Sequence, residues 1–397
     1  MTAMFVLSGL ALATWIYLIL FHGGFWRLRE RLPASPAPAH WPAVVAVVPA
    51  RDEADVIARA IGSLLDQDYP GPFHVVLVDD NSSDGTGGIA RRLAAERGLQ
   101  DRLTVIDGDP LAPGWTGKVW AMEQGLGRAL EIMPDAERVL FTDADIAHPP
   151  SSVRALVAFA VADRRDLVSL MVRLVAATPW ERLLVPAFVL FFAKLYPFAR
   201  VNDPRRSMAA AAGGCMLADR AVLDRGKAMA AISDRLIDDC ALADLVRRHG
   251  SGRIWLGLGP DHLSLRGYDG LAGVWRMVAR TAFTQLRHSP LLLAGTVLGM
   301  VLVYLAGPVT LLAGLLAGGP LMTATGLATC ILMTLSFVPA LRLYRQPLAL
   351  APLLPLAGIL YTLMTVDSAR RHWRRRGGGW KGRYQAKGTD RTGDQGA

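Results

Sequence analysis

Hydrophobic and polar positions divide the chain into two kinds of segment. Long apolar runs occupy both ends, whereas the middle alternates short β-branched runs with longer segments of helical periodicity. Short apolar runs bounded by turn residues predict strands, and apolar positions three and four residues apart predict helices. We therefore expect an α/β domain held between segments long enough to cross a membrane.

The middle of the chain, residues 43–268, predicts a mixed, mostly parallel sheet flanked by helices. Strands are expected over Ala43–Val48, Phe73–Val78, Leu103–Ile106, Val139–Thr142 and Leu167–Leu174. Helices are expected over Ala54–Leu65, Thr86–Arg97, Lys118–Ile132 and Ser152–Ala162. Ligands of such sheets bind beyond the carboxyl ends of the strands, so the residues that follow each strand are candidates for chemistry.

The first apolar run predicts an N-terminal transmembrane anchor over residues 1–26. A cleaved signal peptide would begin with positive charge, but here the bases Arg27, Arg29 and Arg31 come after the run. By the positive-inside rule these bases, and the proline-rich linker over residues 27–42, lie in the cytoplasm. We expect a multi-pass protein of the cell inner membrane with its α/β domain in the cytoplasm.

Three further apolar runs, Leu291–Leu316, Leu321–Leu341 and Leu348–Val366, predict a C-terminal transmembrane region over residues 291–366. A membrane-proximal segment, residues 269–290, precedes it, and a basic tail, residues 367–397, follows. Three crossings would place this tail outside, against the positive-inside rule, so two and three crossings both stay open. An apolar stretch over residues 183–199, broken by two prolines and a lysine, predicts a helix at the membrane interface.

Composition agrees with a membrane protein. The 397 residues are 52% hydrophobic and only 19% charged, which excludes an ordinary soluble enzyme. The net charge of +9 gathers beside the apolar runs, so it indicates anionic lipid rather than nucleic acid. The three cysteines form no CxxC pair, and the sequence implies neither a disulfide framework nor a zinc site.

Two carboxylates one residue apart, Asp143 and Asp145, follow the fourth predicted strand. Residues i and i+2 of an extended chain point the same way, so both side chains can face one hard cation such as Mg²⁺ or Mn²⁺. Such an ion would stabilise charge on a departing diphosphate. A solvated turn is the alternative.

Polar residues follow the first three strands as well. Arg51 and Glu53 come after the first strand, where acids are also ordinary at a helix start. Asp79 and Asp80 open a turn rich in hydrogen-bonding groups, which suits a base or a ribose. Lys118 is one of only five lysines against 38 arginines, and it could balance a diphosphate or lie in solvent.

Later segments add candidates for the acceptor side. Gly213 and Gly214 suit a close approach of the backbone to a ligand, or simply a tight turn. Asp238 and Asp239 head a helical pattern, where a carboxylate is either a helix-start acid or a general base for an attacking hydroxyl.

The order of these motifs resembles that of the inverting glycosyltransferases of family two, which have the GT-A fold. The resemblance spans roughly Val44 to His249 and rests on "PARDE", "VDDNSSDG", "GK", "TDAD" and the "DD" before "ALADLVRRHG". Each motif alone is weak, whereas the ordered set is specific. Within the family, "PGWTGKVWAMEQG" and "LIDDCALADLVRRHG" are most similar to the hopene-associated glycosyltransferases of bacteria, and more distantly to ceramide glucosyltransferases.

The resemblance implies a role for each motif. Asp80, with Asp79, would hold the base of a nucleotide sugar, UDP being the family's usual nucleotide. The other implied roles are pocket lining by Arg51 and Glu53, diphosphate contact by Lys118, ribose and metal contact by Asp143 and Asp145, and base catalysis by Asp239. The family commonly has Glu-Asp where this chain has Asp238 and Asp239, which leaves the role of Asp238 open.

One family motif is missing. Processive members carry Gln-x-x-Arg-Trp before the membrane spans, whereas this chain offers only Arg280, Gln285 and Arg287 without the tryptophan. The absence argues against a processive polysaccharide synthase. These three residues are retained as acceptor-side candidates, together with Gly213, Gly214 and Asp238.

The sequence therefore predicts a membrane-bound glycosyltransferase that moves one sugar from a nucleotide sugar to a lipid, with a hopanoid as the suggested acceptor. Two other classes stay open. A phosphatase resembling the haloacid dehalogenases would use Asp143 as nucleophile, but it leaves "VDDNSSDG" and "TGK" without a role. An inactive membrane scaffold is the third class, and assays of nucleotide-sugar and phosphomonoester turnover separate the three.

Overall fold

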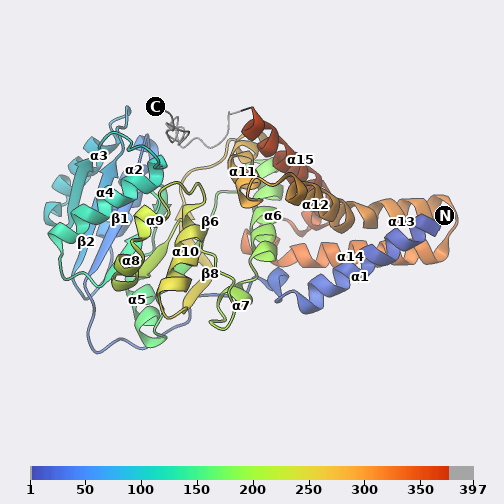
Figure 1. Cartoon of the computed structure of the whole chain (residues 1–397), viewed down its shortest axis with the longest axis horizontal. Helices are drawn as coiled ribbons and strands as arrows, with labels where there is room; N and C mark the ends of the chain where they lie inside the picture. Colours follow the sequence, from blue (N-terminus) through green and yellow to red (C-terminus); the bar gives the residue numbers. More distant parts are fainter. Residues whose placement is uncertain (1, 375–397) are drawn as a thin grey trace, which may run out of the picture.

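The computed structural model describes residues 2–374 and has two parts, an α/β domain and a bundle of apolar helices (Figure 1). The α/β domain lies on the left of Figure 1, and α1, α13 and α14 extend away from it on the right. The predicted α/β class is confirmed. Residues 375–397, which include most of the predicted basic tail, lie outside the described residues.

An eight-stranded sheet forms the centre of the α/β domain, in the order β3-β2-β1-β4-β7-β6-β8-β5. Its first half is parallel and contains β1 (Val44–Ala50), β2 (Phe73–Asp79), β3 (Leu103–Asp107) and β4 (Arg138–Phe141). All four strands were predicted. The β-branched residues of β1 and β2 are buried on both faces, as expected for strands covered on each side by helices.

The second half of the sheet is mixed. The predicted strand β6 (Leu167–Arg173) pairs antiparallel with β7 (Met216–Asp219) and parallel with β8 (Ile254–Ser264). The short strand β5 (Ile146–Ala147) pairs antiparallel with β8 at the edge. The sequence patterns missed β5, β7 and β8.

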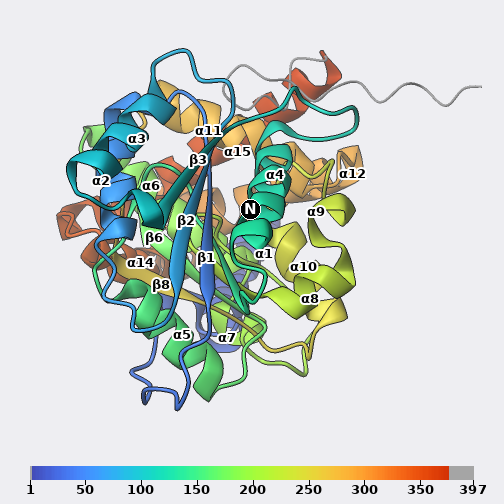
Figure 2. The same ribbon diagram turned by 90° about the vertical axis from the view of Figure 1, so that its left-hand side faces the viewer.

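Helices cover both faces of the sheet (Figure 2). Apolar residues of α2 (Ala54–Leu65), α3 (Thr86–Glu96) and α5 (Ser152–Ala162) share one core with one face of the strands. The opposite face packs on α4 (Gly117–Ile132) and α10 (Asp238–His249). The four predicted helices are therefore present, with ends within a residue of those expected.

Five helices in residues 2–374 are long and apolar enough to cross a membrane. Two are α1 (Thr2–Phe21) and α14 (Pro320–Leu343). A third joins α12 (Pro290–Met300) to α13 (Ala306–Leu316) through one π-helical turn. The fourth contains α15 (Leu354–Trp373), and the fifth contains α6 (Pro179–Leu195) and runs on to Val201.

The helix α6 connects the two parts of the molecule. It begins at a capping box in which Thr178 and Glu181 each accept a hydrogen bond from the other's backbone N–H. More than half of its apolar window is buried, against about a fifth for α1, and its core is continuous with the sheet face that packs on α4. The interfacial position predicted for residues 183–199 stays a prediction, because no membrane is present.

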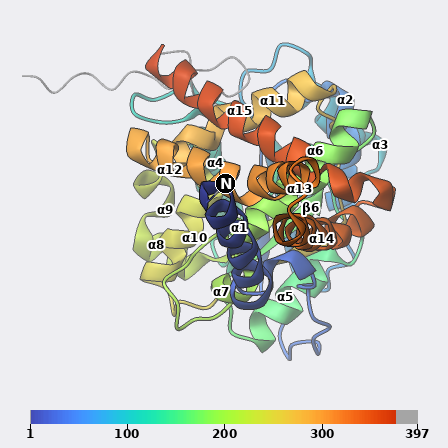
Figure 3. The same cartoon turned by 90° about the vertical axis from the view of Figure 1, so that its right-hand side faces the viewer.

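The helix α15 takes a different path from the bundle (Figure 3). It packs along α11 (Leu271–Gln285), where the indole Nε1 of Trp275 donates to Oδ2 of Asp367 at 2.9 Å. Arg371 also pairs with that carboxylate. Polar contacts of this kind are expensive inside hydrocarbon, and they mark the C-terminal part of α15 as a segment near water.

Candidate active site

Lys118 lies at the centre of the candidate site. It is the second residue of α4, and its ammonium group lies 2.8 Å from Oδ1 of Asp143 and 3.0 Å from Oδ2 of Asp238. Burial alone would lower the pKa of Lys118, but the carboxylates of Asp143 and Asp238 outweigh it and raise the pKa. The lysine is therefore charged and joins segments more than 90 residues apart.

The carboxylates of Asp143 and Asp145 lie in the link between β4 and β5. The hydroxyl of Ser264, at the end of β8, donates to Oδ2 of Asp145 at 3.0 Å. Burial, followed by the charges of Asp143 and Glu53, raises the pKa of Asp145 to about 6. Two carboxylates this close, one of them with a raised pKa, fit a hard divalent cation, which would neutralise both.

Asp239 is held by backbone groups at the start of α10. Its Oδ2 accepts from the N–H of Gly213 at 3.0 Å, and its Oδ1 accepts from the N–H of Cys240 at 2.7 Å. Burial and then the adjacent Asp238 raise the pKa of Asp239, against the opposing effect of Lys118. A raised pKa brings a carboxylate closer to the range of a useful general base.

Gly213 is in contact with two candidate residues. A Cβ at this position would lie 3.3 Å from Nζ of Lys118 and 3.5 Å from Oδ2 of Asp239. The adjacent Gly214 offers its carbonyl oxygen to the hydroxyl of Thr142 at 2.8 Å. The two glycines therefore bring the segment before β7 against the link that carries Asp143.

Arg51 and Asp80 form the opposite end of the site. The guanidinium of Arg51 donates to the backbone carbonyl of Asp80, and it lies 3.6 Å from the carboxylate of that fully buried residue. Glu53, also buried, forms an ion pair with Arg266. Charged groups thus line the sheet edge beyond β1 and β2, where the sequence predicted the nucleotide.

Asp79 has a structural role in the same turn. Its carboxylate accepts from the N–H groups of Ser82 and Gly87, the latter in the first turn of α3. A Cβ on Gly87 would approach Oδ2 of Asp79 to 2.4 Å, so only glycine admits this contact. Contact of Asp79 with a nucleotide stays a prediction.

The candidates on α11 divide into two groups. The side chain of Gln285 donates to the hydroxyl of Tyr196, which follows α6. Arg280 and Arg287 are exposed, the latter in the turn after α11. Gln285 is therefore the residue among the three that joins the membrane-proximal segment to α6.

Two residues of the site were missed by the sequence patterns, Ser264 and Arg266. Ser264 ends β8 and Arg266 lies just after it. The sequence of β8 contains glycines, a proline and an aspartate, so its pattern does not predict a strand. The polar tract "SLRGYD" after an apolar run was the available signal.

Residues 45–226 match the family model described as glycosyl transferase family 2. A search of the curated proteins found no matching sequence. Among solved structures, the mannosyltransferase PcManGT from Pyrobaculum calidifontis, in complex with GDP-Man and Mn²⁺, is 20% identical with a TM-score of 0.54. That match covers 90% of this chain and 99% of the mannosyltransferase.

A second solved structure is glucosyl-3-phosphoglycerate synthase from Mycobacterium tuberculosis, in complex with Mn²⁺, UDP-glucose and glycerol 3-phosphate. It is 19% identical with a TM-score of 0.41, over 62% of this chain and 79% of the synthase. The curled mixed sheet and its flanking helices are those of the GT-A fold. Residues 45–226 thus match the model of glycosyl transferase family 2 over somewhat less than half of the chain, and the fold of the α/β domain is that of GT-A glycosyltransferases.

Proposed function

We propose that the protein transfers a single sugar from a nucleotide sugar to the hydroxyl group of a membrane lipid, with inversion at the anomeric carbon. The observation that carries the proposal is the meeting of Lys118, Asp143 and Asp238 within 3.0 Å, beside Asp145 and Asp239. Direct displacement needs a base for the acceptor, positive charge for the leaving diphosphate and a site that holds both reactants in line. These residues supply the parts.

The donor half of the site consists of Arg51, Glu53, Asp80, Lys118 and the Asp143–Asp145 link. A divalent cation, Mg²⁺ or Mn²⁺, would be held by Asp145 and Asp143 and would stabilise negative charge on the diphosphate. The presence of Mn²⁺ with a nucleotide sugar in PcManGT supports this choice. The ammonium group of Lys118 lies beside the same carboxylates and adds positive charge there.

The acceptor half consists of Asp239 and the residues that hold it. The N–H groups of Gly213 and Cys240 fix both carboxylate oxygens of Asp239. Its raised pKa suits removal of a proton from the attacking hydroxyl as the new glycosidic bond forms. Asp238 pairs with Lys118, so it positions the lysine and does not compete as a base.

A lipid acceptor follows from the course of α6. The apolar core of the sheet continues into this helix and then into α14 and α15. Tyr196, just beyond α6, accepts a hydrogen bond from Gln285 of α11, and this contact supports a path for a lipid along α6 toward the site. A hopanoid acceptor rests on the sequence resemblance alone.

We propose that three helices cross the membrane: α1, the continuous helix made of α12 and α13, and α14. The helix α15 then stays on the side of the α/β domain, where its polar contacts with Trp275 and Arg371 are hydrated. Arg370, Arg371 and Arg374 would then lie on the same side as Arg27 and Arg29. This proposed arrangement, with the site in the cytoplasm, would agree with the positive-inside rule.

The rival functions explain less. A phosphatase that uses Asp143 as nucleophile leaves Asp79 and Asp80 of the "VDDNSSDG" turn without a role. The match to the glycosyl transferase model also disfavours a phosphatase. An inactive scaffold leaves the convergence of charged residues without a purpose.

Titration of UDP into detergent-purified protein, with and without Mn²⁺, tests the proposal. We expect binding that requires Mn²⁺ and weakens at least about tenfold in Asp145→Ala, because one cation ligand is lost. Asp55→Ala, at an exposed position of α2, serves as the control and should bind as the wild type does. Binding that ignores both Mn²⁺ and Asp145→Ala would contradict the proposal.

The acceptor is tested by transfer of radioactive sugar from UDP-sugars into a bacterial lipid extract. Leu195 at the end of α6 is half exposed, so Leu195→Asp changes the bilayer-facing surface without opening the core. We expect this variant to retain UDP binding and to lose lipid transfer. Full lipid transfer by Leu195→Asp would contradict access along α6.

A further inference from the structure

A buried cluster of three potential metal ligands lies behind the active site. His148 follows β5, Cys215 precedes β7 and His262 lies in β8, and one ligand atom of each lies within 4.8 Å of the others. The three side chains are 5%, 0% and 6% exposed. Strand pairing across the sheet therefore brings together residues that are far apart in the sequence.

The hydrogen bonds of the two imidazoles leave one nitrogen of each ring without a partner. Nε2 of His148 lies 2.8 Å from the hydroxyl of Thr142, and that hydroxyl donates to the carbonyl of Gly214. The Thr142 oxygen thus accepts from Nε2–H of His148, which leaves a lone pair on Nδ1.

His262 also has a hydroxyl beside one ring nitrogen and no partner on the other. Its Nε2 lies 2.6 Å from the hydroxyl of Ser152, and its Nδ1, like that of His148, is buried without a hydrogen bond in the described structure. Buried polar atoms without partners are uncommon and unfavourable, and two in one cluster with a thiol call for an explanation.

We propose that His148, Cys215 and His262 bind one Zn²⁺ ion, through Nδ1 of each imidazole and Sγ of the cysteine. Binding displaces the thiol proton to solvent, so two neutral imidazoles and one thiolate leave a net charge of +1 on the complex. The hydroxyls of Thr142 and Ser152 accept from the two Nε2–H groups, which is the usual second layer of contacts around a zinc-bound histidine.

The geometry requires only a small contraction. Zinc bonds of about 2.0–2.3 Å in a tetrahedron place neighbouring ligand atoms roughly 3.3–3.8 Å apart. The ligand atoms lie within 4.8 Å of one another, so neighbouring atoms would approach by up to about 1.0–1.5 Å.

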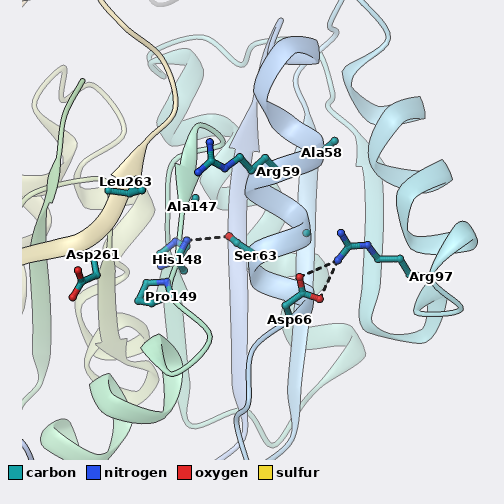
Figure 4. A pocket seen from close by; sticks show the side chains of 11 residues that line it. Ala58, Arg59, Ser63, Asp66, Arg97, Ala147, His148, Pro149, Asp261 and Leu263 are labelled. Atoms are coloured by element: carbon teal, nitrogen blue, oxygen red, sulfur yellow. Dashed lines mark hydrogen bonds and ion pairs between the residues drawn. The ribbon is translucent and has the colours of Figure 1, made fainter. Parts of the chain in front are cut away.

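A cavity gives the ion a route to the cluster (Figure 4). It has a volume of about 320 Å³ and is lined by His148, Asp261, Leu263 and residues of α2. Figure 4 shows His148 among the residues that line this cavity, next to Pro149 and linked to Ser63 of α2. Water from the cavity would supply the fourth ligand.

The cluster is chemically distinct from the Asp143–Asp145 pair. Thiolate and imidazole ligands favour Zn²⁺, whereas paired carboxylates favour Mg²⁺ or Mn²⁺. Thr142 precedes Asp143, Cys215 follows Gly213 and Gly214, and His262 precedes Ser264 by two residues. A bound Zn²⁺ would thus fix three segments that carry catalytic groups, and the inference does not depend on the identity of donor or acceptor.

Cobalt titration of the chelator-stripped, detergent-purified protein tests the proposal, because a cobalt–thiolate bond gives a charge-transfer band in the near ultraviolet. We expect one equivalent of Co²⁺ to produce this band and one equivalent of Zn²⁺ to abolish it. Cys215→Ala should lose the band, and Cys330→Ala, which removes a cysteine of α14, should retain it. The band should also persist in Asp145→Ala, which separates the cluster from the carboxylate pair.

Ser152→Ala gives a second variant that keeps all three ligands. Loss of the hydroxyl that holds His262 should weaken Zn²⁺ binding by about 10- to 100-fold in competition with a chromophoric chelator. Absence of a thiolate band in the wild type would overturn the proposal. It would also be overturned if Cys215→Ala bound the same number of Zn²⁺ ions with the same affinity.

Discussion

The ammonium group of Lys118 lies 2.8 Å from a carboxylate oxygen of Asp143, across the boundary between α4 and the β4–β5 link. The same group lies 3.0 Å from Asp238 at the head of α10. One cation therefore separates two carboxylates that would otherwise repel each other. The ammonium group of Lys118 therefore holds Asp143 and Asp238 close together even without a bound ligand.

Removal of the charge should impair catalysis. We expect Lys118→Met to lower the rate of sugar transfer by roughly 10²- to 10³-fold, the scale on which fixed charges stabilise a transition state. Lys118→Arg should restore part of the rate. Lys227→Met, at an exposed position, is the matched control. Transfer by Lys118→Met at the wild-type rate would show that the lysine acts only in packing.

Asp239→Asn separates base catalysis from donor binding. Loss of a general base costs about 10²- to 10⁴-fold in turnover. The affinity for UDP with Mn²⁺ should stay within about threefold of wild type, since Asn keeps the size of the side chain and one of the two backbone hydrogen bonds. Asp244→Asn, on the same helix and paired with Arg248, is the control. A parallel loss of UDP affinity and turnover would assign Asp239 to the donor instead.

Metal affinity should depend on pH through Asp145. Its pKa is raised to about 6, so below pH 6 protons compete with the cation for the carboxylate. The dissociation constant for Mn²⁺ should increase about tenfold for each pH unit below 6 and should level off above pH 7. Ser264→Ala removes a hydrogen bond that favours the ionised form, so it should shift the whole profile to higher pH. A profile that is flat between pH 5 and 8 would contradict the assignment.

Two glycines of α4 give a matched pair for stability. A Cβ on Gly125 would lie 2.6 Å from Val47 and 2.8 Å from Val78, so Gly125→Ala should destabilise the fold by about 1–3 kcal/mol through overpacking. Gly127 faces open space, and Gly127→Ala should stabilise the helix by about 0.5–1 kcal/mol. Thermal unfolding of the purified variants measures both changes. Equal midpoints for the two variants would contradict the packing of α4 on β1 and β2.

The first half of the sheet could be predicted from the sequence because its strands are β-branched runs with clear turn residues at each end. The strand β7 could not, since Met216–Asp219 is short and follows a run of alanines and glycines. The strand β8 is interrupted by Gly257, Gly259 and Pro260, which read as a loop. Both strands lie in the mixed half of the sheet, where the order of the strands is β7-β6-β8-β5 and differs from their order in the chain.

The same limit applies to the site. The residues predicted from strand ends, such as Asp143 and Lys118, needed only local patterns and the family's motif order. Ser264 and Arg266 enter the site through the pairing of β5 with β8, which no local pattern reveals. The cluster of His148, Cys215 and His262 was not predicted either, because the spacing of these residues in the chain matches no local metal motif.

The pairing of β5 with β8 also has a consequence for biosynthesis. Asp145 and its partner Ser264 are 119 residues apart, and three strands lie between β4 and β5 in the sheet. A nascent chain that has emerged only as far as α10 contains both aspartates of the pair but lacks the strand that orients them. Because the chain is made from its N-terminus, Asp145 cannot receive the hydrogen bond of Ser264 until β8 has emerged from the ribosome. The cation site therefore forms late in synthesis.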